Sequence, residues 1–304
     1  MALLALALAC ALLGCSSPAS PDPPAQRRID GDEPVADVDA VFIDVEALLK
    51  VPHGALTLLD ARDRGDFRAG HLPGAQHLPW RDFVDGPRSG KLVGDLARVR
   101  ARLERAGVSA ERPVVVYGAW GAGWGEEGRI YWMLEHLGHR NVRVLRGGVA
   151  AYRAAGRALT TGVRVVPRGR FPLAVREGLR ARTHDVLRAL SSGDAVIVDT
   201  RSLSEYGGLT PHGSPRGGHV PRAVHLAWTD LFDERDRLLP RSMLRARLAA
   251  LGIGEDTPVI AYCTGGVRSG FLYMVMRWAG YEAVRNYDGS FWEWSRRDEL
   301  PVAR

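Results

Sequence analysis

Short apolar runs alternate with amphipathic stretches along most of this chain. The apolar runs are rich in β-branched residues and predict strands at residues 56–59, 114–117, 142–145, 196–199, 259–262 and 283–287. The amphipathic stretches predict helices, for example at residues 92–106, 243–251 and 269–279. Strands that alternate with helices are typical of a parallel sheet covered by helices on both faces. The pattern therefore predicts an α/β fold, in which ligands bind at the carboxyl ends of the strands.

The pattern of anchor residues occurs twice. The anchors recur in the same order, pairing Asp60 with Asp199, Arg62 with Arg201, His71 with His219, Trp80 with Trp228 and Gly147 with Gly289. A long-period repeat of this kind indicates two copies of one structural unit. We therefore predict one domain over residues 40–156, a connection containing Gly and Pro over 157–178, and a second domain over 179–304.

Cys263 lies where a predicted strand becomes a predicted helix. In the run VIAYCTGGVRSG, residues 259–270, two glycines follow the cysteine closely and Arg268 comes just before the helix. Backbone N–H groups of such a turn, the helix dipole and the arginine all favour an anion in the loop. The pattern therefore predicts a lowered pKa for the Cys263 thiol and a reactive thiolate.

The two copies differ around this loop. The counterpart of Cys263 is Gly118, and the loop that follows, AWGAGWGEEG, is longer by three residues. The second copy has nine more residues between Asp199 and His219, in the stretch GGLTPHGSPRGG. The first domain therefore has no nucleophile, and the insertion forms either a rim of the active-site mouth or a plain surface loop.

Composition narrows the range of partners. The 304 residues are 46% hydrophobic and 25% charged, which is ordinary for a globular chain long enough for two domains. Only Lys50 and Lys91 are lysines among the 41 basic residues, and no stretch combines basic with aromatic residues as a nucleic-acid surface would. We therefore predict no nucleic-acid partner, and the net charge of +6 helps to attract small anionic substrates.

The N-terminus resembles the export signal of a bacterial lipoprotein. Its apolar core is followed by Leu-Leu-Gly-Cys15 and then by a Ser/Pro-rich stretch. We predict a signal over residues 1–15 with lipidation at Cys15, a tether over 16–39, and a protein exported to the periplasm or cell envelope. The membrane is then contacted only through the lipid anchor, because the apolar segment is short for a transmembrane helix. An uncleaved or misassigned start is the alternative.

Processing at this site would change the inventory of thiols. Cys10 would leave with the signal and the thiol of Cys15 would carry lipid. Cys263 would then be the only free thiol of the mature chain, with no partner for an intramolecular disulfide.

Two longer motifs and the cysteine loop resemble a known family. The run FRAGHLPGAQHL at 67–78 is similar to the N-terminal signature of the tandem-domain rhodaneses, and VRNYDGSFWEW at 284–294 is similar to their C-terminal signature. That family includes thiosulfate and 3-mercaptopyruvate sulfurtransferases, and the resemblance covers nearly all of residues 40–296. It implies two rhodanese-like domains, the first non-catalytic and the second catalytic, with no metal and no organic cofactor.

The resemblance also implies a chemistry for the loop. Cys263 would take the outer sulfur of a small anionic donor as a persulfide and pass it to a thiophilic acceptor such as cyanide or a thiol. The persulfide would be cradled by the backbone N–H groups of Thr264, Gly265, Gly266, Val267 and Arg268. The loop Cys-Thr-Gly-Gly-Val-Arg matches neither Cys-Arg-Lys-Gly-Val-Thr of thiosulfate enzymes nor Cys-Gly-Ser-Gly-Val-Thr of mercaptopyruvate enzymes. The donor therefore stays open, with thiosulfate favoured.

Several side chains have supporting roles in this interpretation. Arg268 either binds the sulfonate or carboxylate of a donor or points to solvent. Asp199 is expected to orient the loop, and Arg201 either pairs with Asp199 or faces the substrate. His71 and His219 lie in equivalent turns shortly before a proline, which favours a structural role for both. The nine histidines show no metal-ligand spacing.

Two other functions remain in competition at this point. A loop with Cys and Arg also binds phosphate in cysteine-dependent phosphatases, but those have five residues between the two side chains, whereas four separate Cys263 from Arg268. The second alternative is a non-enzymatic module that binds or senses sulfur, which the complete loop argues against. The sequence makes no prediction of oligomeric state.

Overall fold

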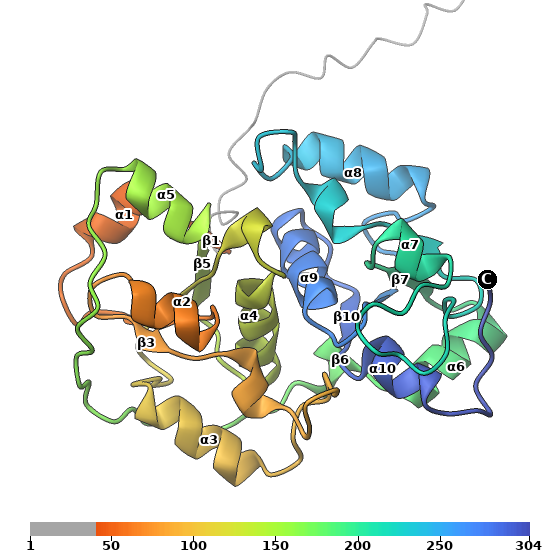
Figure 1. The fold of residues 1–304 in the computed structure, drawn as a ribbon, viewed down its shortest axis with the longest axis horizontal. Helices are drawn as coiled ribbons and strands as arrows, with labels where there is room; N and C mark the ends of the chain where they lie inside the picture. Colours follow the sequence, from red (N-terminus) through yellow and green to blue (C-terminus); the bar gives the residue numbers. More distant parts are fainter. Residues whose placement is uncertain (1–40) are drawn as a thin grey trace, which may run out of the picture. The chain divides into compact units, whose positions relative to one another are not determined.

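The computed structural model describes residues 41–304 (Figure 1). The predicted signal, the lipidation site at Cys15 and the tether over 16–39 lie outside the described residues. Within residues 41–304, no helix is long and apolar enough to cross a membrane.

The N-terminal domain is built on a five-stranded parallel sheet. In spatial order its strands are β1 (Phe42–Ile43), β5 (Val142–Leu145), β4 (Val114–Tyr117), β2 (Thr57–Asp60) and β3 (Gln76–His77). Its α-helices are α1 (Val45–Lys50), α2 (Arg64–Ala69), α3 (Leu96–Arg105), α4 (Glu126–His136) and α5 (Gly148–Ala154), with short 3-10 helices η2 (Trp80–Phe83) and η3 (Trp120–Ala122).

The C-terminal domain repeats this arrangement. Its five parallel strands are ordered β6 (Arg180–Ala181), β10 (Val284–Tyr287), β9 (Val259–Tyr262), β7 (Val196–Asp199) and β8 (Val224–His225). Its α-helices are α6 (Thr183–Ser192), α7 (Leu203–Tyr206), α8 (Arg241–Ala250), α9 (Arg268–Trp278) and α10 (Ser290–Ser295), with 3-10 helices η4 (Glu177–Leu179) and η5 (Trp228–Leu231). The α/β class and the two-copy organisation are therefore confirmed.

Each sheet is covered by helices on both of its faces. The inner faces share one apolar cluster, to which α4 contributes Trp132 and Met133 and α9 contributes Tyr273 and Met274. The helices α4 and α9 pack directly against each other, side by side at the centre of Figure 1. Separate apolar clusters fill the outer face of each sheet. The two domains therefore share a core.

The segment between α5 and η4 runs along the N-terminal domain. Thr160 pairs with His71 in an isolated bridge, and the N–H of Gly169 donates to the carbonyl of Glu104 at 2.8 Å. A Cβ at Gly169 would overlap the carbonyl oxygen of Val108, so only glycine fits this approach. The predicted connection is thus bonded to the first domain along its length.

Candidate active site

Cys263 follows β9 directly, at the carboxyl end of the parallel sheet. Its Sγ accepts a hydrogen bond from the N–H of Gly266 at 3.1 Å, and its own N–H donates to Oγ of Ser290 at 3.1 Å. The residue is only 2% exposed. The loop therefore curls around the sulfur and holds it inside the protein.

The C-terminal signature fixes this loop from the other side. The N–H groups of Phe291 and Trp292, in the first turn of α10, donate to the carbonyls of Cys263 and Thr264, each at 2.9 Å. The backbone of the loop at Cys263 and Thr264 is thereby held by α10. The motif at 284–294 therefore contributes to the site by fixing the shape of the cysteine loop 263–268.

Both loop glycines are required by close packing. A Cβ at Gly265 would overlap the ring of Trp292. Gly266 has φ +76°, and a Cβ there would lie 2.6 Å from both Nη1 of Arg129 and the carbonyl oxygen of Asp288. A side chain at either position would push the loop away from the sulfur.

Arg268 does not point to solvent, which was one of the two roles considered for it from sequence. It is 5% exposed and donates from Nη1 to Oε2 of Glu205 at 2.6 Å and from Nη2 to Oε1 at 2.9 Å. Nη2 also donates to Oγ1 of Thr264 at 2.7 Å. The guanidinium is therefore buried in an ion pair beside the loop, and does not point to solvent.

Glu205 was missed by sequence reasoning. It is the third residue of α7, where it forms a capping box with Ser202, and the Ser-x-x-Glu spacing of that box was its one sequence signal. Burial favours the neutral carboxyl, but hydrogen bonds and charge from Arg268, with a bond from Thr264, lower the pKa of Glu205 to about 2. Glu205 is thus an anion that holds Arg268 in place.

The surroundings of Cys263 favour its thiolate. Burial alone would raise the pKa of this thiol, but the charge of Arg268 and hydrogen bonds from Ser269 and Gly265 outweigh burial. The net result is a pKa below the ordinary value of a cysteine. The loop therefore favours the nucleophilic form of the cysteine.

Asp199 and Arg201 form a buried ion pair. Arg201 Nη2 lies 2.6 Å from Oδ2 of Asp199 and donates to the carbonyl of Gly218 at 2.8 Å. The hydroxyl of Tyr262 also donates to Asp199, at 2.6 Å. The Arg201 side chain is 2% exposed, so of the two roles considered for it Arg201 takes the pairing with Asp199 and does not face the substrate.

The same constellation occurs in the domain that lacks a cysteine. Arg62 pairs with Asp60 at 2.6 Å and donates to the carbonyl of Gly70 at 2.8 Å, and Tyr117 donates to Asp60 at 2.6 Å. Because this ion pair is also present in the domain without a nucleophile, its role is to stabilise the turn that follows the strand.

His71 and His219 have the structural role that was predicted for them. His71 Nδ1 is hydrogen-bonded to the carbonyl of Phe67 at 2.8 Å, and its ring stacks on the Phe67 ring at 3.9 Å. His219 makes the same two contacts with Tyr206, at 3.0 Å and 3.6 Å. Each histidine therefore fixes the end of a short helix against its turn.

Both length differences between the copies lie at this site. Trp124, from the longer loop of the first domain, makes an edge contact with His212 of the insertion, with ring centroids 5.3 Å apart. Arg268 Cζ lies 5.5 Å from the Trp124 ring, and His212 Nε2 lies 4.0 Å from Oε1 of Glu205. The insertion is therefore a rim of the site, with Trp124, which is 51% exposed, as its counterpart.

The N-terminal domain has no room for a nucleophile. A Cβ at Gly118, the counterpart of Cys263, would overlap the carboxyl of Glu127. Burial raises the pKa of Glu127 to about 8, so this carboxyl is neutral at pH 7. A carboxyl group thus fills the place that a thiol would need.

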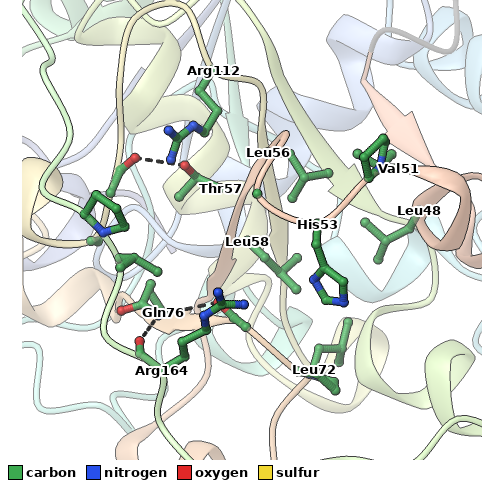
Figure 2. A pocket seen from close by; sticks show the side chains of 18 of the residues that line it. Leu48, Val51, His53, Leu56, Thr57, Leu58, Leu72, Gln76, Arg112 and Arg164 are labelled. Carbon is green, nitrogen blue, oxygen red and sulfur yellow. Dashed lines mark hydrogen bonds between the residues drawn. The ribbon is translucent and has the colours of Figure 1, made fainter.

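A cavity of about 460 Å³ lies in the N-terminal domain (Figure 2). Leu56, Leu58 and Leu72 form part of its wall, and Arg112 and Arg164 lie around it. No residue of the loop 263–268 lines this cavity, so it is separate from the site described above.

Comparison with known proteins identifies both halves of the chain. The rhodanese-like domain family matches residues 44–155 and again residues 183–297. Relatives include the sulfur carrier protein TtuD of Thermus thermophilus, 34% identical over 78% of this chain and 87% of that protein. The thiosulfate sulfurtransferase of Pseudomonas aeruginosa is 34% identical over 81% of this chain and 90% of that protein. The thiosulfate sulfurtransferase of Corynebacterium glutamicum is 34% identical over 77% of this chain and 79% of that protein.

Solved structures agree on the fold. The Escherichia coli 3-mercaptopyruvate sulfotransferase SseA covers 82% of this chain and 98% of its own, with a TM-score of 0.71 and 24% identity. A structure of EanB covers 86% of this chain and 70% of its own, with a TM-score of 0.77 and 21% identity. With both halves matched and the cysteine loop complete, the chain belongs to the rhodanese family and is a sulfurtransferase with two rhodanese-like domains.

Proposed function

We propose that the protein moves the outer sulfur of thiosulfate to a thiophilic acceptor through a persulfide on Cys263. The observation that carries the proposal is the Cys263 sulfur itself, which accepts the Gly266 N–H at 3.1 Å beside the buried cation of Arg268. These groups stabilise negative charge on the first sulfur and on the persulfide that replaces it. The acceptor is cyanide or a thiol.

The reaction consists of two displacements at sulfur. The Cys263 thiolate attacks the outer sulfur of thiosulfate, the sulfur–sulfur bond of the donor breaks, and sulfite leaves with the bonding pair. The acceptor then attacks the outer sulfur of the persulfide, and the thiolate of Cys263 leaves with the bonding pair. No proton has to move when cyanide is the acceptor, so the site needs no general base.

Thiosulfate is proposed over 3-mercaptopyruvate because of the named relatives. Thiosulfate sulfurtransferases appear among them from Corynebacterium glutamicum, Pseudomonas aeruginosa and Azotobacter vinelandii, at 31–34% identity. The mercaptopyruvate enzyme SseA is similar at 24% identity, which supports the fold alone.

The arginine argues against phosphatase chemistry. A phosphate-binding loop uses the two terminal nitrogens of its arginine as a fork. In this protein, both terminal nitrogens of Arg268 already donate to Glu205, and Nη2 donates to Thr264 as well. We therefore do not propose a phosphatase.

Mass spectrometry tests the persulfide directly. After incubation with thiosulfate and without reducing agent, the tryptic peptide 248–268 is expected to gain one sulfur, about 32 Da, on Cys263. Cyanide should remove the added mass and yield thiocyanate. Parallel incubation with 3-mercaptopyruvate decides the donor. An unchanged peptide mass with both donors, in folded protein, would rule out the proposed chemistry.

We also propose that the protein is exported and anchored by lipid at Cys15. The support is the sequence Leu-Leu-Gly-Cys15 after an apolar core. In bacteria fed labelled palmitate, the unaltered chain and Cys10→Ser are expected to carry label in the membrane fraction, and Cys15→Ser to carry none. Label in Cys15→Ser, or its absence from the unaltered chain, would refute the anchor.

A further inference from the structure

Arg129 of the non-catalytic domain reaches the catalytic loop. It lies on α4 and is 1% exposed. Nη1 donates to the carbonyl of Gly266 at 3.3 Å, and Nη2 donates to the carbonyl of Gly90 at 2.5 Å. The guanidinium also lies over the ring of Trp132, with Cζ 4.6 Å from the centroid. Arg129 is therefore enclosed by both domains.

Two glycines bring the arginine to this position. A Cβ at Gly128 on α4 would overlap the backbone of Phe271 on α9, and a Cβ at Gly270 on α9 would lie 2.9 Å from Cα of Arg129. The absence of side chains at the crossing lets the two helices approach backbone to backbone. Arg129 therefore emerges from α4 directly beside the loop that begins α9.

Arg129 differs from three other buried arginines in its partners. Arg62, Arg201 and Arg268 each pair with a carboxylate at 2.6 Å. Within residues 41–304, no carboxylate oxygen lies within 4.0 Å of an Arg129 nitrogen. A buried charge with no counter-ion is costly.

Asp288 acts on Arg129 through its charge but makes no ion pair with it. Its carboxylate pairs with Arg180 at 2.9 Å and accepts the N–H of Leu92 at 2.7 Å. Burial lowers the pKa of Arg129 to about 10, against the opposing charges of Asp288 and Cys263, so Arg129 stays protonated at neutral pH.

The Cys263 thiolate is the second anion whose charge acts on Arg129. Gly266 joins the two groups, because its N–H donates to Sγ of Cys263 while its carbonyl accepts from Arg129. A Cβ at Gly266 would lie 2.6 Å from Nη1 of Arg129, which shows how closely the guanidinium follows the loop. The non-catalytic domain thus places a fixed cation behind the loop that holds the sulfur.

We propose that Arg129 is a positioning residue and, beside Arg268, a second counter-ion of the sulfur anion on Cys263, supplied by the domain that has no nucleophile. For the thiolate this holds whatever the sulfur donor is. For the persulfide it rests on the function proposed above.

The rate at which iodoacetamide alkylates Cys263 reports how much of the thiol is ionised, and this measurement needs no sulfur donor. The full chain is treated with iodoacetamide across pH 5–10, and the modified peptide 248–268 is quantified by mass spectrometry, which separates Cys263 from Cys10 and Cys15. In Arg129→Met the midpoint of the pH profile is expected to move upward, with about three- to tenfold slower alkylation at pH 7. Arg129→Lys retains the charge and should keep its midpoint close to that of the unaltered chain.

The control loosens the same interface without altering charge. The hydroxyl of Tyr273 on α9 donates to Oε2 of Glu135 on α4 at 2.8 Å, and Tyr273→Phe removes this contact between the domains. Tyr273→Phe should leave the midpoint unchanged.

Two results would overturn the proposal. One is an unchanged midpoint in folded Arg129→Met. The other is an equal shift in Tyr273→Phe, which would mean that general loosening is responsible. If Arg129→Met does not fold, Arg129→Lys serves as the test. An alkylation midpoint of Cys263 in Arg129→Lys that is as high as the midpoint of a cysteine in an unfolded chain would also overturn the proposal. Failure of sulfur transfer in the unaltered protein would leave these profiles intact and would therefore count against the donor chemistry alone.

Discussion

Replacing Cys263 with serine is expected to abolish the formation of thiocyanate from thiosulfate and cyanide, with a rate at least about 10⁴-fold lower. A hydroxyl cannot form the persulfide, and the favourable surroundings of the sulfur do not make serine an anion at neutral pH. Serine is slightly smaller than cysteine and can still accept the Gly266 N–H, so the loop should keep its shape. The colorimetric thiocyanate assay measures the effect.

The matched control uses the other two cysteines. The double variant Cys10→Ser/Cys15→Ser should keep the full rate in detergent extracts, because neither residue belongs to the loop 263–268. Substantial activity in Cys263→Ser would assign the chemistry to another group. An equal loss in the double variant would point to processing of the N-terminus instead.

Replacing Arg268 with methionine should affect both activity and stability. The rate should fall about 100-fold, because a cation that stabilises the sulfur anion is removed. The free energy of unfolding should fall by about 3 kcal/mol, because Glu205 is left buried without its partner at 2.6 Å. Thiocyanate formation and urea unfolding followed by tryptophan fluorescence measure the two effects.

Glu205→Gln separates these two effects. It breaks the same ion pair and should lose similar stability, but it removes a negative charge near the loop, so the pKa of Cys263 should fall where Arg268→Met raises it. Opposite shifts of the alkylation midpoint are therefore expected at similar stability. Shifts of the same sign in both variants would show that loosening of the loop, and not charge, controls the thiol.

The long central elements could be predicted from sequence because their periodicity is strong. The strands at 114–117, 142–145, 196–199 and 259–262 agree with the structure to the residue. The edge strands β1, β3, β6 and β8 were missed, because two residues carry no alternation. The helix expected from residue 92 begins at Leu96, because Asp95 caps it by accepting the N–H of Arg98 at 3.0 Å.

The site was predicted only where its chemistry is local. The loop 263–268 could be found because the strand, the cysteine, the glycines and the arginine are consecutive. Glu205 could not be predicted as a site residue, because its spacing to Ser202 is already explained by the helix cap. Arg129 depends on the packing of α4 against α9, which joins residues more than a hundred positions apart and leaves no mark in a linear pattern.

The Glu127 carboxyl limits how the N-terminal domain could acquire a nucleophile. Since it occupies the space that a side chain at Gly118 would need, a single change of Gly118 to cysteine would force the new thiol against a buried acid. A change of Glu127 alone would leave a hole beside a residue without a side chain. Neither step is favourable by itself, so a nucleophile at position 118 would require both substitutions together. Two positions at once, 118 and 127, therefore keep the N-terminal domain non-catalytic.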